Sequence, residues 1–272
     1  MKKNFNKDYL FDKKKWDACS EFPLHLDLEL NTSCNLACLM CPREKDSSED
    51  MPLNVAKKII KYCSENGTLT IKPFWRGEGT LYPHIEEILK YAKDCGLQVM
   101  INSNGSFKHG LSCAKYIDWL SISVDKYHGN VNKEMFKKVK ELKKMTYVEI
   151  QTCDKDNKEI AEFCFNNKIK LNHNPIVKRN IKNEYEYISY ENNEIKQCTH
   201  PFWRILIGSD LYARYCCIRW DDSARLSKID INNLDCIKEI WNNNTYYNIR
   251  KQHLDKKIIE KDCINCKHCH VV

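Results

Sequence analysis

Residues 24–41 read "LHLDLELNTSCNLACLMC". The first eight residues alternate apolar and polar side chains, a pattern that predicts a β-strand with one face buried. Three cysteines follow at once, Cys34, Cys38 and Cys41, in the spacing Cys-x3-Cys-x2-Cys. The stretch therefore predicts a strand whose carboxyl end carries a cluster of thiols.

Strand-like and helical patterns alternate from this stretch to residue 176. Further apolar, β-rich runs occupy 69–75, 98–104, 119–125, 147–153 and 169–175, and helical patterns lie near 52–66, 84–96, 110–117, 131–145 and 157–167. Six such units favour parallel strands joined by right-handed crossovers. Polar clusters follow the strands, at the positions where βα barrels have the loops that carry their active sites. We expect an α/β fold, a partial (β/α)6 TIM-like barrel, although periodicity alone also allows a doubly wound sheet.

The regular alternation of strand and helix patterns ends at residue 176. We expect an N-terminal extension over 1–23, the barrel core over 24–176, and a smaller module over 177–272. In that module the polar run 178–197 is interpreted as a linker or loop, and "ILIGSDLYARYCC" (205–217) predicts a hairpin that turns near Gly208. A single helix is expected over 234–253.

Composition restricts the setting of the protein. The chain has 272 residues, 16 cysteines and a net charge of +7. No apolar signal segment and no run long enough to cross a membrane is visible, so we expect a cytoplasmic protein with reduced cysteines that bind metal where they cluster. The lysines are spread over helical faces, which favours solvated surfaces over a surface that attracts anionic substrates. We expect no membrane partner and no nucleic-acid partner.

Three clustered thiols indicate a metal centre, either a zinc site or an iron–sulfur cluster. A structural zinc ion usually takes four protein ligands, and here the fourth would have to come from a distant residue. A [4Fe–4S] cluster held by three thiolates instead keeps one iron open to another ligand. Both readings remain open on spacing alone.

The spacing of Cys34, Cys38 and Cys41 after a first strand resembles the radical S-adenosylmethionine (SAM) superfamily. In that family SAM chelates the open iron. The sequence "RGEG" (76–79) resembles the family's Gly-Gly-Glu-Pro motif, although Arg76 and Gly79 depart from it. The resemblance implies two 4Fe-4S clusters, one of them SAM-binding and one auxiliary. It implies SAM contacts at Met40, Gly77, Glu78, Ser103, Asn104, Ser123 and Asp125.

The cysteines near the C-terminus resemble the SPASM/Twitch module of radical SAM enzymes, which encloses auxiliary iron–sulfur clusters. The resemblance implies one auxiliary cluster bound by Cys198, Cys216, Cys263 and Cys266. Cys217 is an alternative to Cys216, and Cys269 is an alternative to Cys263 or Cys266. A zinc ribbon is the alternative for the module as a whole.

The resemblance implies a reaction of the dehydrogenase type. SAM is cleaved to a 5′-deoxyadenosyl radical that abstracts a hydrogen atom from substrate, and a two-electron oxidation follows with the auxiliary cluster as electron acceptor. The substrate is expected to be small or carrier-linked, for example the alcohol of a sugar or aminocyclitol, with flavodoxin or ferredoxin as electron donor. His173, Lys178 and Arg179 are candidate bases for the hydroxyl proton, and Arg179 is selected.

Two other functions stay open. The first is a radical SAM maturase of peptides or proteins, which the short stretch before the first strand disfavours because it leaves no room for a peptide-recognition domain. The second is a non-catalytic zinc or iron–sulfur binding protein.

Overall fold

The computed structural model describes residues 21–38, 41, 43, 49–154, 156–174, 177–179, 185–187, 198–219, 222–255, 257, 259 and 263. Of residues 177–179 and 185–187 it describes the backbone. All statements below concern these residues.

Parallel strands form the centre of the molecule. In chain order they are β1 (His25–Leu28), β2 (Thr70–Lys72), β3 (Gln98–Ser103), β4 (Trp119–Ser123), β5 (Tyr147–Thr152) and β6 (Lys170–His173), and each pairs in parallel with the next. All six strands were predicted from the sequence. Within the described residues the sheet stays open, with β6 at one edge, which agrees with a partial barrel.

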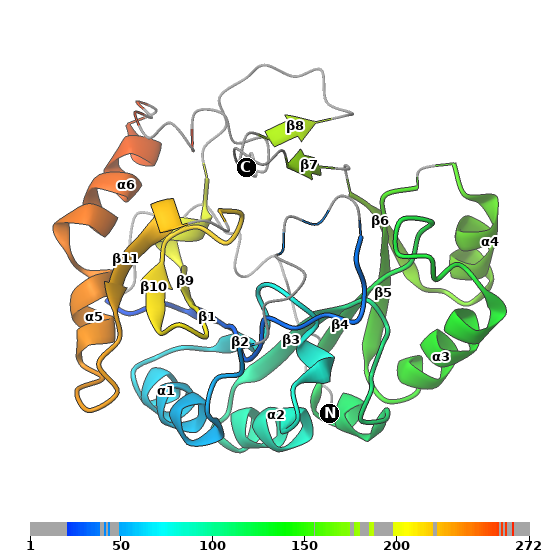
Figure 1. Ribbon diagram of the computed structural model, residues 1–272, viewed down its shortest axis with the longest axis horizontal. Coiled ribbons are helices and arrows are strands. Elements are labelled where there is room, and N and C mark those ends of the chain that lie inside the picture. The colour runs from blue at the N-terminus through cyan, green and yellow to red at the C-terminus, as the bar shows by residue number, and fades with distance from the viewer. Residues whose placement is uncertain are drawn as a thin grey trace.

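Helices cover the outer side of the curved sheet (Figure 1). They are α1 (Leu53–Glu65), α2 (Ile85–Asp94), α3 (Lys133–Lys143) and α4 (Lys158–Asn166). These four confirm four predicted helices. The fifth prediction, over 110–117, is wrong in type, because Ser112–Tyr116 form a short 3-10 helix, η4.

The alternation in β1 separates the core from the concave face of the sheet. Leu26, Leu28 and Leu30 are fully buried in the main hydrophobic cluster, which includes the inner faces of the helices. Because successive side chains of a strand point to opposite faces, His25, Asp27 and Glu29 lie on the concave side. Burial of each leucine contributes about 1.5–3 kcal/mol to folding.

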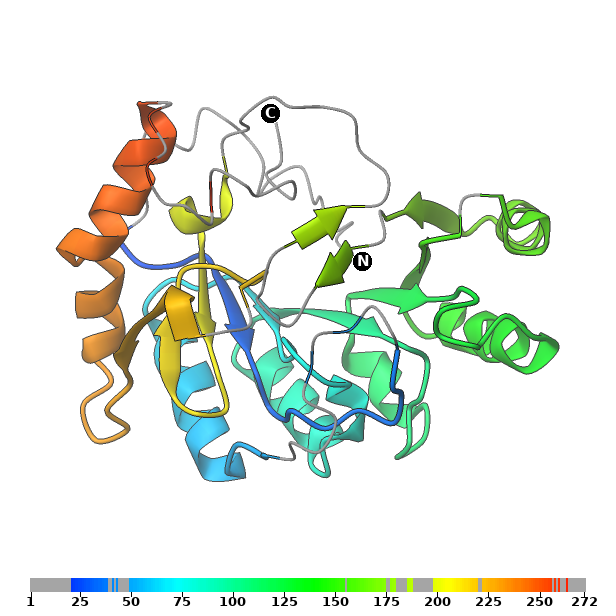
Figure 2. The same cartoon turned by 45° about the horizontal axis from the view of Figure 1, so that its top comes forward.

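The predicted hairpin is confirmed, and it extends the same sheet. Strand β9 (Arg204–Ile207) pairs in parallel with β1, and β10 (Tyr212–Arg214) pairs antiparallel with β9. A third strand, β11 (Arg225–Lys228), was not predicted and pairs antiparallel with β10. Figure 2 shows these strands beside β1. The division of the chain into two modules stays a prediction.

Two predictions for the second half of the chain are wrong. The stretch interpreted as a linker or loop includes two residues of β7 (Val177–Arg179) and all of β8 (Tyr185–Tyr187), and these strands pair antiparallel in a sheet of their own. The single predicted helix is two helices, α5 (Cys236–Trp241) and α6 (Asn244–Leu254). The break arises at Asn243, whose side chain accepts a 2.8 Å hydrogen bond from the Tyr246 N–H and so caps a new helix.

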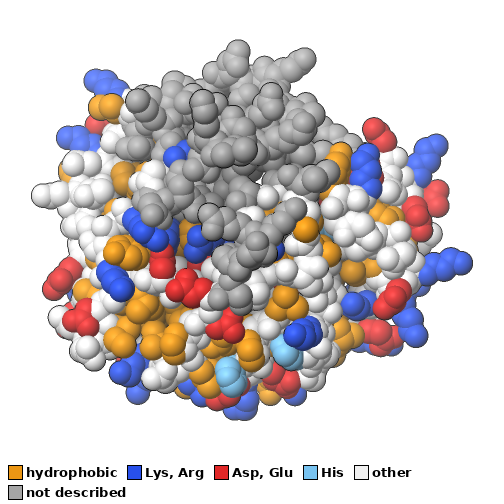
Figure 3. Space-filling view, in the orientation of Figure 1, with side chains coloured by type: hydrophobic (Ala, Val, Ile, Leu, Met, Phe, Trp, Pro, Cys, Tyr) orange, Lys and Arg blue, Asp and Glu red, His pale blue; other side chains and the backbone are white. Residues whose placement is uncertain are grey.

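The surface agrees with the predicted spread of charge. Basic and acidic side chains are interspersed on the face shown in Figure 3. No helix in the described ranges is both long enough and apolar enough to cross a membrane.

Candidate functional site

Cys34 lies in the loop after β1, beside the loop after β3. The Leu36 N–H points at its sulfur at 3.4 Å, and the Asn104 side-chain amide approaches the same sulfur at 3.7 Å. Asn104 also donates a 2.9 Å hydrogen bond to the side chain of Asn35. Further along the first loop, the Cys41 N–H donates to the carbonyl of Cys38 at 3.0 Å. The cysteine loop and Asn104, a predicted SAM contact, therefore meet at one edge of the sheet.

Gly77 packs directly on the loop that leads to Cys34. Its φ is +69°, and a Cβ there would lie 2.7 Å from the carbonyl oxygen of Thr32 and closer still to that of Ser33. The next residue, Glu78, donates its N–H to the Ser33 carbonyl at 2.8 Å. Only a residue without a side chain allows this close approach of two backbones.

The carboxylate of Glu78 holds the loops after β2 and β3 together. It is 2% exposed and accepts hydrogen bonds from the Thr80 hydroxyl (2.6 Å), the Ser103 hydroxyl (2.8 Å) and the Asn104 N–H (2.7 Å). Burial raises the pKa of Glu78, and these hydrogen bonds oppose that rise. Since its side chain is occupied in this way, Glu78 fixes the loop positions.

Asp125 organises the loop after β4 in a similar way. Its carboxylate accepts from the backbone and the ring of His128, at 2.9 and 2.8 Å, and from the Tyr127 N–H at 2.9 Å. Burial alone would raise the pKa of Asp125, but the contacts with His128 lower it. Asn130, which was not predicted, donates to the carbonyls of both Asn104 and Ser123 and so connects the third and fourth loops.

The three thiols fit an iron–sulfur cluster by their chemistry. Burial raises the pKa of Cys34 and of Cys38, and for Cys38 the charges of Cys41 and Cys34 raise it further. Within the described ranges, no three His, Cys, Asp or Glu side chains form a group that could hold one metal ion. In a [4Fe–4S] cluster each thiolate binds a different iron, so its ligands need not converge on one point, and soft thiolates suit iron–sulfur clusters.

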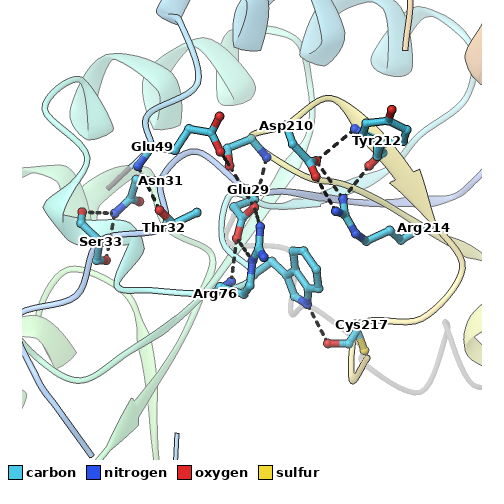
Figure 4. A network of polar contacts seen from close by, with 12 residues as sticks. Glu29, Asn31, Thr32, Ser33, Glu49, Arg76, Asp210, Tyr212, Arg214 and Cys217 are labelled. Atoms are coloured by element: carbon cyan, nitrogen blue, oxygen red, sulfur yellow. Dashed lines mark hydrogen bonds and ion pairs between the residues drawn. The ribbon is translucent and has the colours of Figure 1, made fainter. Parts of the chain in front are cut away.

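Arg76 departs from the Gly-Gly-Glu-Pro motif and forms a partly buried ion pair (Figure 4). Its guanidinium donates two 2.8 Å hydrogen bonds to the carboxylate of Glu29 at the end of β1. The same carboxylate accepts from the backbone and hydroxyl of Ser209, both at 3.1 Å, in the turn between β9 and β10. The arginine therefore connects the loop after β2 to the hairpin.

The loop after β2 also contacts Cys217, the alternative to Cys216 among the predicted auxiliary ligands. The Trp75 indole N–H donates to the Cys217 carbonyl at 2.7 Å, and the Cys217 sulfur lies 3.5 Å from Nδ1 of His200. Burial raises the pKa of Cys217, Arg204 opposes this, and Cys198 adds to the rise. Cys198 and Cys217 therefore lie within electrostatic reach of one another.

Several predicted residues lie elsewhere or outside the described part of the chain. Met40, Cys266 and Cys269 are outside it. Arg179 and Lys178 lie in β7, where the backbone alone is described, and His173 is exposed at the end of β6. The ligand sets and the base therefore stay predictions.

The fold resembles that of solved enzymes over almost its whole length. It matches BtrN in complex with AdoMet and 2-DOIA with a TM-score of 0.65 at 15% identity, covering 92% of this chain and 94% of the other. The chain has the radical SAM fold. The same radical SAM fold matches Streptococcus suis SuiB bound to the precursor peptide SuiA, with a TM-score of 0.64, 18% identity and coverage of 87% and 68%. It also matches anSMEcpe with bound AdoMet, with a TM-score of 0.61, 15% identity and coverage of 90% and 83%.

Two curated proteins resemble part of this chain in sequence. Both are S-adenosylmethionine-dependent nucleotide dehydratases. The one from Flammeovirga pacifica is 33% identical over 110 residues, and the one from Selenomonas ruminantium is 32% identical over 106. Each match covers 37% of this chain and 38% of the relative. The chain therefore matches well under half of the length of these relatives. No protein family model matches the chain.

Proposed function

We propose that the chain is a radical SAM enzyme that generates a 5′-deoxyadenosyl radical and abstracts a hydrogen atom from a small polar substrate. One observation carries the proposal: the amide of Asn104 lies against the sulfur of Cys34 while its backbone is held by Glu78. Three separate sequence motifs thus converge at the carboxyl ends of adjacent parallel strands, where such folds bind their ligands.

Cys34, Cys38 and Cys41 would hold a [4Fe–4S] cluster at this edge. Reduced by an external donor such as flavodoxin or ferredoxin, the cluster supplies the electron that cleaves SAM. The loops of Gly77, Ser103 and Ser123 would bind SAM through backbone and hydroxyl groups, while Glu78 and Asp125 hold those loops in position.

For the step after hydrogen abstraction we propose a two-electron oxidation. The substrate loses one hydrogen atom to the 5′-deoxyadenosyl radical, then one electron to an auxiliary cluster and one proton to a base, so that an alcohol becomes a ketone. Cys198 with Cys216 or Cys217, together with Cys263 and Cys266, would bind that cluster. The contact of Cys217 with His200 and with Trp75 supports a site beside the SAM loops.

A second candidate is dehydration of a nucleotide, favoured by the names of the two curated relatives. One feature of the concave face agrees with an anionic substrate. Asp27 is paired with both Arg204 and Lys72, and burial lowers the pKa of the neighbouring His25 to about 4, which leaves it neutral at pH 7. The group holds two basic side chains against one carboxylate, and burial lowers the pKa of Lys72. An excess of basic groups favours phosphate.

Anaerobic reconstitution followed by product analysis tests the proposal. We expect about eight iron atoms per chain and reductive cleavage of SAM to 5′-deoxyadenosine. Protein without iron, or without this cleavage, would sink the enzyme proposal. Loss of two hydrogen atoms from the substrate supports oxidation, whereas loss of water supports dehydration.

Replacing both Cys216 and Cys217 by Ala separates the two reactions. Oxidation needs the auxiliary acceptor, so SAM cleavage should persist while the oxidised product disappears. A product yield that is unchanged in this variant would contradict the role of the auxiliary cluster.

A further inference from the structure

Two buried side chains on the concave face of the sheet each have a polar atom without a hydrogen-bond partner among the described residues. Ser121 in β4 and Glu149 in β5 are each 1% exposed. Among the described residues, neither the Ser121 hydroxyl nor Oε1 of Glu149 has a hydrogen-bond partner. Because buried polar groups are nearly always satisfied, an unpaired buried carboxylate oxygen requires an explanation.

The register of the sheet places these two groups side by side. Ser121 pairs with Glu149 across the parallel strands. Their neighbours Leu120, Ile122 and Ile150 belong to the main hydrophobic cluster under the helices. Since side chains alternate along a strand, Ser121 and Glu149 face the opposite, concave side.

The same register gives the depth of the pair below the SAM loops. Asn102 in β3 pairs with Ser121 and so lies in the same layer. Two residues further on, Asn104 touches the sulfur of Cys34. Two residues of strand span about 7 Å, so the pair lies roughly one side-chain layer beneath the proposed SAM site.

Other buried carboxylates among the described residues are paired. Glu29 is held by Arg76 and Ser209, and Glu78 by the hydroxyls and N–H groups around it. Glu149 differs from them. Lys170 is its register partner on β6, but that side chain is exposed, and no ion pair joins the two.

We propose that Ser121 and Glu149 form a substrate subsite that binds an amino group. An amine offers several N–H donors and, when protonated, the positive charge that a buried carboxylate favours, while the serine hydroxyl can accept or donate. The side-chain amides of Asn102 and Gln151, joined at 3.5 Å, border the same layer. This inference rests on the proposed function, because the layer under SAM is where an abstracted hydrogen must lie.

Matched pairs of probes test the amine preference. Glucosamine is compared with glucose, and cytidine triphosphate with uridine triphosphate, by calorimetry on the SAM-loaded holoprotein. We expect the amine of at least one pair to bind about tenfold more tightly, and Glu149→Gln to remove that preference. The pair that shows the preference distinguishes an amino sugar from a nucleotide. Equal or undetectable binding within both pairs would overturn the proposal.

A second measurement does not depend on the identity of the substrate. If Glu149 and Ser121 are unpartnered in the ligand-free protein, Glu149→Gln and Ser121→Ala should leave Tm unchanged or raise it. Glu29→Gln is the matched control, a paired buried carboxylate whose loss should lower Tm. A drop for Glu149→Gln as large as that of the control would assign Glu149 a structural role and overturn the subsite.

The two proposals fail in different ways. If the wild-type holoprotein does not cleave SAM, the proposed function is wrong. The amine preference and the Tm comparison then still decide whether Ser121 and Glu149 bind an amino group. A protein that cleaves SAM but shows no amine preference loses the subsite alone.

Discussion

Gly77 and Cys34 show how single residues define the site. The glycine permits the loop after β2 to lie on the backbone that precedes the first cysteine, and Glu78 then hydrogen-bonds both that loop and the next. At this scale the chemistry depends on close contacts between backbones as much as on the thiols.

Replacing Gly77 by Ala tests that contact. The new Cβ meets two carbonyl oxygens at a φ of +69°, so we expect about 2–4 kcal/mol lower stability to urea and weaker SAM binding. Gly96→Ala is the control, since its φ is +82° and nothing lies within 4 Å of the added Cβ. An equal loss of stability in both variants would mean that backbone strain alone, and not the contact with Thr32, sets the cost.

The cysteines can be tested in the same matched way. Cys38→Ala should lose the iron of the first cluster and abolish SAM cleavage, because two thiolates cannot hold a cluster that has an open iron. Cys113→Ala removes a thiol that is 3% exposed within the hydrophobic cluster and should keep both iron and activity. Iron analysis and the yield of 5′-deoxyadenosine measure the outcome, and iron retained by Cys38→Ala would argue against the ligand set.

Spacing in the sequence was enough to locate the cysteines, Gly77 and Asn104, because each sits at the end of a predicted strand or shortly after it. It could not show that the carboxylate of Glu78 joins its own loop to the loop after β3, or that the carboxylate of Asp125 turns back into its own loop. Nor could it single out Asn130, which lies in no motif and acts through two carbonyl contacts. Such roles depend on which loops become neighbours in the folded chain.

Secondary-structure elements depend on short polar contacts at their ends. In the turn between β9 and β10, the carboxylate of Asp210 accepts from the Tyr212 N–H at 3.1 Å and pairs with the guanidiniums of Arg214 and Arg225. Burial alone would raise the pKa of Asp210, but its basic partners, Arg214 above all, lower it from 3.8 to about 2.

The sign of this shift gives a pH prediction. A carboxyl whose pKa is lower in the folded state stabilises the fold above its unfolded pKa and loses that contribution as the pH falls. Asp210→Asn should therefore cost about 2 kcal/mol at pH 7, and the difference from wild type should shrink between pH 4 and pH 2. Urea unfolding at several pH values measures this, and a difference that stays constant down to pH 2 would contradict it.

Elements with a strong period were predicted well, and interrupted ones were not. The six parallel strands and the helices α1 to α4 follow apolar patterns that local physics alone explains. The split between α5 and α6 was missed because "WNNNTYY" preserves the helical period while Asn243 recaps the chain. Strands β7 and β8 were missed because a polar run was read as a loop, although "YEY" alternates.

At the scale of the whole molecule, the ion pair of Glu29 with Arg76 joins three distant parts of the chain. It connects β1, the loop after β2 and the turn at Ser209. A buried carboxylate that loses its main cationic partner is strongly unfavourable.

Arg76→Met should therefore lower stability by about 2–4 kcal/mol and increase hydrogen exchange in β9 and β10. Adding Glu29→Gln to the same chain should restore a large part of the loss, because the unpaired charge is removed. Exchange in α3 serves as the internal reference. Additive losses in the double variant would show that the pair is not coupled.

The pairing of β1 with β9 has a consequence for how the protein is made. Glu29, which precedes the first cysteines, donates its N–H to the carbonyl of Ile207, so the strand has its full set of neighbours only when that late segment is present. Contacts between residues so far apart form late, and synthesis proceeds from the N-terminus. On the ribosome, the thiols of Cys34 and Cys38 emerge long before β9 can pair with β1, the strand that precedes their loop. Iron is therefore expected to be loaded after translation has passed β9.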